Sequence, residues 1–122
     1  MVLLNRFNID VSNRKYAKSS FFMIERFNVP KEMSGILLSI SIPYEYVKLV
    51  LVYDSCYNLR AEATQLHEGR VVRIHQKEIY TSSDAKHGRI HEGEWIIAFK
   101  LDKAIELDDL DEACIIEVHG DK

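Results

Sequence analysis

The sequence predicts an all-β fold, an antiparallel β-sandwich of the jelly-roll kind, in a single domain over residues 1–122. Apolar and polar residues alternate, most clearly in the Leu-Ser-Ile-Ser-Ile run at 38–42, and this period is typical of a half-buried strand. Turn-forming pairs such as Val29-Pro30 and Glu68-Gly69 recur between the apolar runs. Short strands at such regular spacing favour a sandwich or jelly roll over other architectures.

The predicted strands follow one another along the whole chain. A weak candidate opens it, and the complete set is residues 3–11, 21–27, 38–42, 47–53, 71–75, 95–101 and 113–119. The 47–53 segment is apolar on both faces, so we expect it to be covered more deeply than the others. Only residues 59–67 and 104–112 have room for a turn or two of helix, and no linker or repeat divides the chain.

The segment Gly88–Trp95 brings the only tryptophan into an apolar strand through a turn that contains two glycines. Side chains alternate along a strand, which places Trp95, Ile97, Phe99 and Leu101 on one face. We expect this face to line the core, with Trp95 as its anchor, because an indole buries a large apolar area. The alternative is that Trp95 forms an exposed platform on which a ligand stacks.

Composition restricts the class of protein. The chain is 47% hydrophobic and 29% charged, which are globular values, and its net charge is -3. Binding to nucleic acid or to an anionic membrane needs a concentrated positive field, so we expect neither partner. No apolar run approaches the ~20 residues that cross a bilayer, and the N-terminus lacks the pattern of a secretory signal. We therefore expect a cytoplasmic protein, in which Cys56 and Cys114 are buried free thiols.

No group of residues has the spacing of a catalytic or metal site. His87 and His91 are four apart, but Gly88 and Gly93 disfavour a helix, so we expect a solvated loop. The acidic tract at 102–112 lacks the ligand order of a calcium loop. Ser82-Ser83-Asp84 lacks a glycine-flanked elbow and is typical of a turn. We expect no catalytic residue, no metal ligand and no cofactor.

The region after the 47–53 strand has two interpretations, a structural ion pair and a ligand groove. Asp54 and Arg60 have the spacing to bridge the intervening turn and fix its geometry. The alternative is a shallow polar groove for a sugar or a peptide, although tyrosines in sheets are commonly cross-strand packing partners. The residues of that groove are Tyr57, Arg60, Arg73, Tyr80, His87 and His91, with Tyr44 and Tyr46 as further exposed aromatics.

Several of these segments, taken in order, resemble the N-terminal β-sandwich that precedes the catalytic domain in some PHP-type (polymerase and histidinol phosphatase) metal-dependent phosphoesterases. The resemblance covers about residues 20–100. It is carried by Phe27-Asn28-Val29-Pro30, residues 47–54, Asn58-Leu59-Arg60, Thr81-Ser82 and Gly88-x-Ile90-x-x-Gly93-x-Trp95.

The resemblance implies an accessory domain without activity of its own, because the metal ligands of those enzymes begin in the next domain with Gly-Asp-Leu-His-x-His. This chain has Gly120-Asp121 but neither the leucine nor the two histidines, so no catalytic residue is carried over. Asn58 stands where the family has a glycine, and asparagine tolerates the left-handed conformation. We expect a binding module whose partner is a phosphoesterase catalytic domain or another protein. The alternatives are a carbohydrate-binding module and a small metal-dependent hydrolase that uses His75, His87 and His91.

Overall fold

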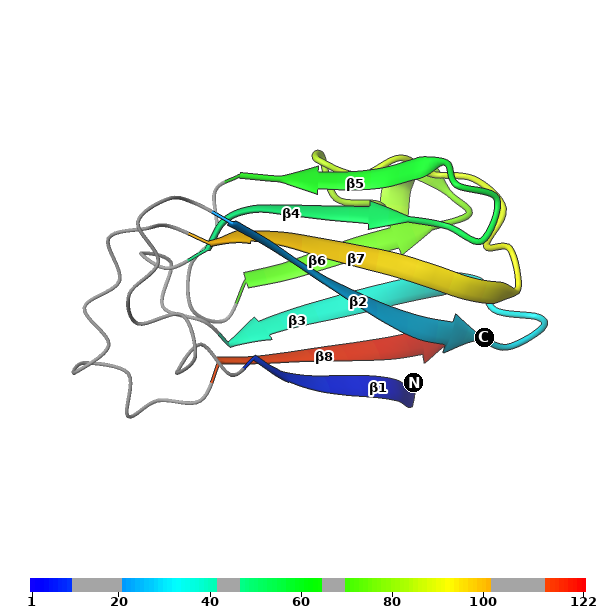
Figure 1. The fold of residues 1–122 in the computed structure, drawn as a ribbon. Helices are drawn as coiled ribbons and strands as arrows, with labels where there is room; N and C mark the ends of the chain where they lie inside the picture. Colours follow the sequence, from blue (N-terminus) through cyan, green and yellow to red (C-terminus); the bar gives the residue numbers. More distant parts are fainter. Residues whose placement is uncertain (10–20, 42–46, 65–69, 102–113) are drawn as a thin grey trace.

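The computed structural model describes residues 1–9, 21–41, 47–64, 70–101 and 114–122, which form two four-stranded antiparallel sheets packed face to face (Figure 1). The first sheet has the strand order β1-β8-β3-β6 and the second β2-β7-β4-β5. The strands are β1 (Val2–Ile9), β2 (Phe21–Val29), β3 (Gly35–Ser41), β4 (Val47–Tyr53), β5 (Leu59–Ala63), β6 (Arg70–His75), β7 (Gly93–Leu101) and β8 (Cys114–Asp121). The predicted all-β sandwich is confirmed.

The strand order is that of a jelly roll. Strand β4 pairs with β5, β3 with β6, β2 with β7 and β1 with β8, all antiparallel. The strands thus pair as in one long hairpin that reverses direction at the β4–β5 turn. Successive strand pairs of this hairpin alternate between the two sheets. No helix among the described residues is long and apolar enough to cross a bilayer.

Among the described residues, Trp95 is the largest fully buried side chain, and it is 0% exposed. Its ring is 6.1 Å from that of Phe27, which lies 6.4 Å from Phe7 of the other sheet. The predicted core face of β7 is confirmed at Trp95, Ile97 and Phe99. Every strand contributes to this core, whose other members are Val29, Met33, Ile36, Leu38, Ile40, Val50, Val52, Ala61, Ala63, Val72, Ile74, Ile90, Ile116 and Val118.

Two expectations about local structure and burial are wrong. Residues 59–63 form β5 rather than a helical turn, because Ala61 and Ala63 alternate into the core while the strand pairs with β4. Cys56 is free but exposed, since it lies at the corner of the β4–β5 turn rather than in a strand. The remainder of the 59–67 prediction from residue 65, and all of 104–112, fall outside the described residues.

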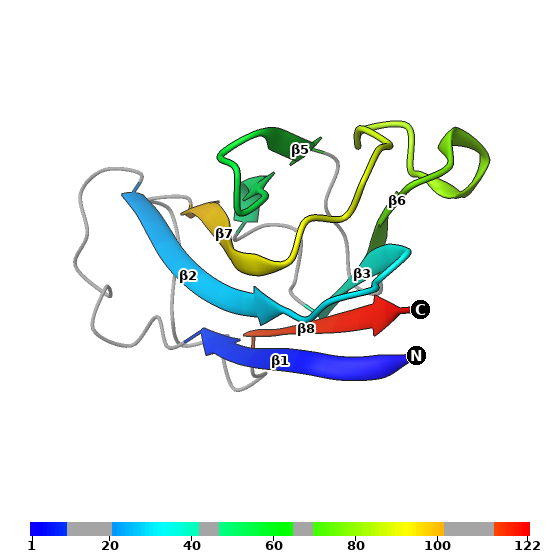
Figure 2. The same ribbon diagram turned by 90° about the vertical axis from the view of Figure 1, so that its right-hand side faces the viewer.

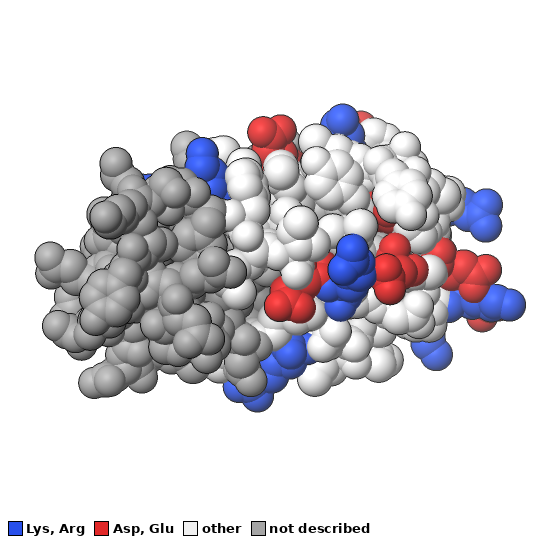
Figure 3. All heavy atoms as spheres, viewed as in Figure 1, with Lys and Arg blue, Asp and Glu red and all other residues white. Residues whose placement is uncertain are grey.

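The outer face of the second sheet is partly apolar. On it Phe22 and Ile24 of β2 are 52% and 57% exposed, and Leu49 and Leu51 of β4 are half-buried. Figure 3 shows wide uncharged areas between the charged side chains on this side of the molecule. A third expectation, that the 47–53 strand is covered more deeply than the others, is also wrong, because β4 is buried on its inner face and only half covered on its outer face.

The connection between β6 and β7 closes one long side of the sandwich (Figure 2). Its backbone bonds the edges of both sheets: Ser82 N donates to Arg73 O of β6 at 2.9 Å, and Glu62 N of β5 donates to Asp84 O at 2.9 Å. Lys86 N then donates to Arg60 O at 2.7 Å. This pairing covers edges that would otherwise be open to association, and it leads the chain to the end of the sandwich where β7 begins.

Replacing Trp95 with alanine should lower the free energy of unfolding by about 3–5 kcal/mol, the usual cost of deleting a large buried aromatic side chain. Chemical denaturation measures it. The control is Ile79→Ala, whose side chain is 83% exposed and whose loss should change stability by about 0.5 kcal/mol or less. A loss below about 1 kcal/mol for Trp95→Ala would contradict the core role of the indole.

Candidate functional site

A shallow hollow of about 520 Å³ lies at the end of the sandwich where the β4–β5 turn meets residues 86–91 of the β6–β7 connection. We call it the end hollow. Two chain segments line it, and their residues are Asp54, Tyr57, Asn58, Leu59, Arg60, Lys86, His87, Gly88, Arg89 and His91. Its volume falls within the range of small-ligand sites.

The buried pair of Asp54 and Arg60 forms the frame of the end hollow. The side chains are 1% and 6% exposed, and Arg60 Nη1 lies 3.2 Å from Asp54 Oδ2. This ion pair confirms the predicted bridge across the turn. The Arg60 guanidinium carbon also lies 5.5 Å from the centre of the Trp95 ring, within the range of a cation–π contact.

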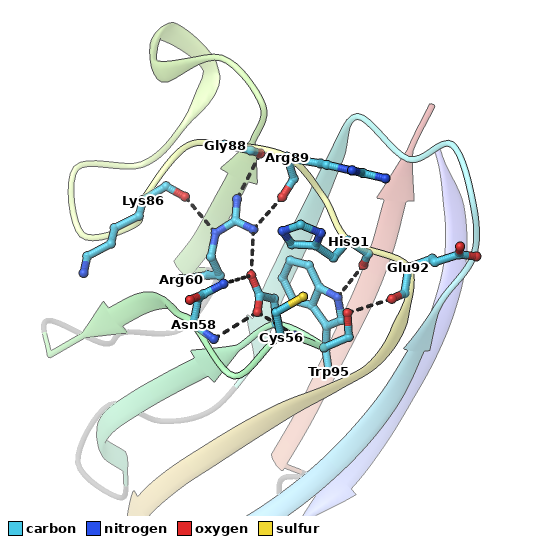
Figure 4. Close-up of polar contacts among 11 residues, drawn as sticks. Cys56, Asn58, Arg60, Lys86, Gly88, Arg89, His91, Glu92 and Trp95 are labelled. Carbon is cyan, nitrogen blue, oxygen red and sulfur yellow. Dashed lines mark hydrogen bonds and ion pairs between the residues drawn. The ribbon is translucent and has the colours of Figure 1, made fainter.

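Arg60 also holds the second wall of the hollow through its remaining N–H groups. It donates to the carbonyl oxygens of Lys86 at 3.3 Å, Gly88 at 3.0 Å and Arg89 at 2.8 Å (Figure 4). Gly88 and Gly93 bend this segment with φ of 142° and 117°, values that favour glycine. The tryptophan fixes the segment a second time, because Trp95 Nε1 donates to His91 O at 2.8 Å.

The Asp54 carboxylate organises the β4–β5 turn. Its Oδ1 accepts hydrogen bonds from the backbone N–H groups of Cys56 at 2.9 Å and Asn58 at 3.0 Å, and its Oδ2 accepts one from Asn58 Nδ2 at 3.3 Å. Burial opposes ionisation of this carboxyl. The hydrogen bonds from Asn58, Cys56 and Arg60 outweigh burial, so the pKa of Asp54 lies below its ordinary value.

Tyr57 is the residue of the turn that adopts the left-handed conformation, with φ of 65°. From the resemblance to the accessory domains we expect this conformation at Asn58, and that expectation is wrong by one residue. The Tyr57 side chain is 78% exposed beside the end hollow. A bulky aromatic residue is thus held where the backbone conformation favours glycine.

Four basic residues lie along the other wall of the end hollow: Lys86, His87, Arg89 and His91. Within the described part of the chain, none of these side chains has a hydrogen-bond or ion-pair partner. Figure 4 shows the Lys86 and Arg89 side chains leaving the segment in opposite directions, with the His91 ring between them. As predicted, His87 and His91 lie in a loop and not on a helix.

The structure brings together four of the six predicted groove residues: Tyr57, Arg60, His87 and His91. It places the other two elsewhere. Arg73 belongs to the first sheet, where its Nη2 lies 3.6 Å from Asp121 Oδ2. Tyr80 ends the short 3₁₀ helix Glu78–Tyr80, and its ring packs 5.1 Å from that of His75. Tyr44 and Tyr46 lie outside the described residues.

Sequence reasoning missed Lys86, Arg89 and Asn58 as lining residues. The signal for the first two was available, because four of the six residues at 86–91 are basic in a chain of net charge -3. As for metal ligands, the described ranges bring no three His, Cys, Asp or Glu side chains together. His67 and the acidic tract at 102–112 are outside those ranges.

The substitution Asp54→Asn should lower the free energy of unfolding by about 3–5 kcal/mol at neutral pH, because it leaves the Arg60 charge buried without a carboxylate. In the wild type, the lowered pKa makes this contribution present above the ordinary value of 3.8 and lost as the pH falls through the folded-state pKa. The variant should lack this acid-dependent loss. Denaturation from neutral pH to about pH 2 measures both effects.

The matched control is Asp121→Asn, whose partner Arg73 is 40% exposed. Breaking an exposed pair of this kind should cost less than about 1 kcal/mol. Equal losses in the two variants, or a difference of less than about 1 kcal/mol between wild type and Asp54→Asn, would contradict the role given to the buried pair.

Comparison of the chain with protein-family models, with curated proteins and with solved structures finds no match.

Proposed function

We propose that the chain is a non-catalytic interaction module that binds its partner at the end hollow, with Tyr57 as the central contact. The observation that carries the proposal is that Tyr57 combines a left-handed backbone with an exposure of 78%. A non-glycine residue in this conformation costs about 1–2 kcal/mol. Because the exposed ring buries little apolar surface, packing within the fold offsets little of this cost. We therefore assign the ring a role in binding rather than in stability.

An exposed tyrosine on a rigid support suits a binding contact. Aromatic anchors supply large contact area with few rotatable bonds, and they dominate many protein interfaces. The support is rigid because Asp54 accepts hydrogen bonds from both Cys56 and Asn58, the residues on either side of Tyr57. Little conformational entropy is lost when such a preorganised ring is covered by a partner.

We propose, from the resemblance to accessory domains, that the partner is the catalytic domain of a PHP-type phosphoesterase in the cytoplasm. The spatial arrangement of the resembling segments supports the proposal. The end of β4 and the Asn58-Leu59-Arg60 segment are close in sequence, and the distant Gly88–Trp95 segment meets them around Arg60. The partly apolar outer face of the second sheet offers further surface for a protein contact.

A carbohydrate-binding module is the second candidate, and the exposed Tyr57 ring favours it because a sugar ring stacks on such a face. The other polar groups of the hollow do not add to this case. The carboxylate of Asp54, the amide of Asn58 and most N–H groups of Arg60 are already hydrogen-bonded within the protein. We therefore rank the protein partner first.

The substitution Tyr57→Gly should separate folding from binding. It removes the left-handed strain, which is offset in part by the flexibility of glycine, so the free energy of unfolding should rise by up to about 1 kcal/mol. Partner binding should be lost. Denaturation measures the first effect. For the second, wild-type and variant chains are used to capture partners, and each captured protein is then purified and titrated by calorimetry.

Two matched variants serve as controls for this test. Tyr57→Phe keeps the ring and should retain binding, and Tyr80→Ala removes a half-exposed tyrosine outside the hollow and should also retain it. Loss of stability by more than about 1 kcal/mol in Tyr57→Gly would show that the ring packs within the fold. Unchanged binding in that variant would contradict the proposed function.

The purified chain should hydrolyse neither phosphomonoesters nor phosphodiesters when manganese, iron or zinc is added, since metal-assisted hydrolysis needs a fixed set of ligands with an open position. Colorimetric phosphate release and a chromogenic diester assay measure this. Turnover that survives repurification and disappears in His87→Ala or His91→Ala would overturn the non-catalytic proposal and favour a small metal-dependent hydrolase.

A further inference from the structure

Arg89 differs from the other arginines that the structure describes. Five of them have a carboxylate partner: Arg6 with Glu117, Arg26 with Glu94, Arg60 with Asp54, Arg70 with Asp84 and Arg73 with Asp121. Arg89 has none within the described residues, although the chain as a whole carries an excess of acidic residues. Its charge at the rim of the end hollow is therefore available to a ligand.

The uncompensated positive charge of the hollow comes from two residues, Arg89 and Lys86. Lys86, also without a partner within the described residues, lies on the opposite side of His91 (Figure 4). Among the residues that the structure describes, Asp54 is the only acidic one that lines the hollow, and its charge is balanced by the buried Arg60. The end hollow thus has a net positive character in a protein of net charge -3.

The polar groups of the hollow that have no partner within the described residues favour a charged ligand over one that offers uncharged hydroxyl groups. The amide of Asn58 donates to Asp54, and the guanidinium of Arg60 is engaged with three carbonyl oxygens. The groups that have no partner in the described part of the chain are the Tyr57 hydroxyl, Asn58 Oδ1, two imidazoles and two long cations. The two cations favour carboxylates or other anions over an uncharged ligand.

We propose that the ligand of the end hollow is an acidic segment of a partner protein, a run of Asp and Glu residues that crosses from Lys86 to Arg89 past Tyr57. The inference rests on the proposed function. Lys86 and Arg89 point in opposite directions, so a single small anion does not reach both, and a chain with repeated carboxylates does. Recognition of acidic motifs by basic clusters is an established mode of peptide binding.

The test is binding of a fluorescent decapeptide of alternating Glu and Ser, followed by anisotropy at low salt, with a peptide of alternating Gln and Ser as the comparison. The Glu peptide should bind and the Gln peptide should not, and binding should weaken as the ionic strength rises. Arg89→Gln and Lys86→Gln should each weaken binding by about threefold, and the double variant by about tenfold, as for partly exposed charge pairs.

The matched control is Arg26→Gln, which removes an exposed arginine that already has a partner, Glu94, and which should leave binding unchanged. Amide shifts in an NMR titration should map to Tyr57 and residues 86–91. Equal binding of the two peptides, no binding at low salt, or no effect of the double variant would overturn the inference.

Two further outcomes separate this inference from the proposed function. In the first, the captured partner requires Tyr57 while its affinity changes neither with ionic strength nor in the double variant. The hollow is then a binding site, and the assignment of an acidic ligand is wrong. If a sulfated oligosaccharide binds through Arg89 and Lys86 and the Glu peptide does not, the protein partner is wrong and the carbohydrate candidate replaces it.

Discussion

The buried charge of Arg60 is the constraint on which this end of the molecule depends. An arginine that is 6% exposed must have its charge balanced and its N–H groups bonded. Asp54 balances the charge, and the carbonyl oxygens of Lys86, Gly88 and Arg89 accept the remaining hydrogen bonds. The β4–β5 turn and the β6–β7 connection are therefore fixed to each other, and together they cover one end of the Trp95 ring.

The same constraint accounts for the shape of the proposed binding surface. Arg60 bonds the backbone oxygens of Lys86, Gly88 and Arg89, while the Lys86 and Arg89 side chains leave the segment in opposite directions and lie at the hollow. Because Asp54 holds the turn, the left-handed residue Tyr57 presents its ring beside them. A buried, hydrogen-bonded network thus positions exposed polar side chains that have no partner among the described residues. Binding sites on rigid supports require such positioning.

Much of the fold was predictable because it rests on local patterns. Alternation gives the strands and the buried face of Trp95, and spacing gives the Asp54–Arg60 bridge. The wrong predictions concern residues whose conformation and position are determined by tertiary contacts. Residues 59–63 have no strong strand pattern and become β5 through pairing with β4. Sequence spacing could not reveal that Arg73 and Tyr80 lie away from the hollow, or that Tyr57 rather than Asn58 adopts a positive φ.

The central claim is that the fork of Arg60 orders the segment that forms the hollow. Residue-resolved amide hydrogen exchange on wild type and Arg60→Lys tests it most directly, because lysine keeps the charge opposite Asp54 but its three N–H donors cannot bond Asp54 and three carbonyl oxygens together. The account predicts faster exchange at Lys86 and Gly88, whose amides bond Arg60 O and His75 O, with unchanged protection in the centre of β7. Unchanged exchange at these two amides would contradict it.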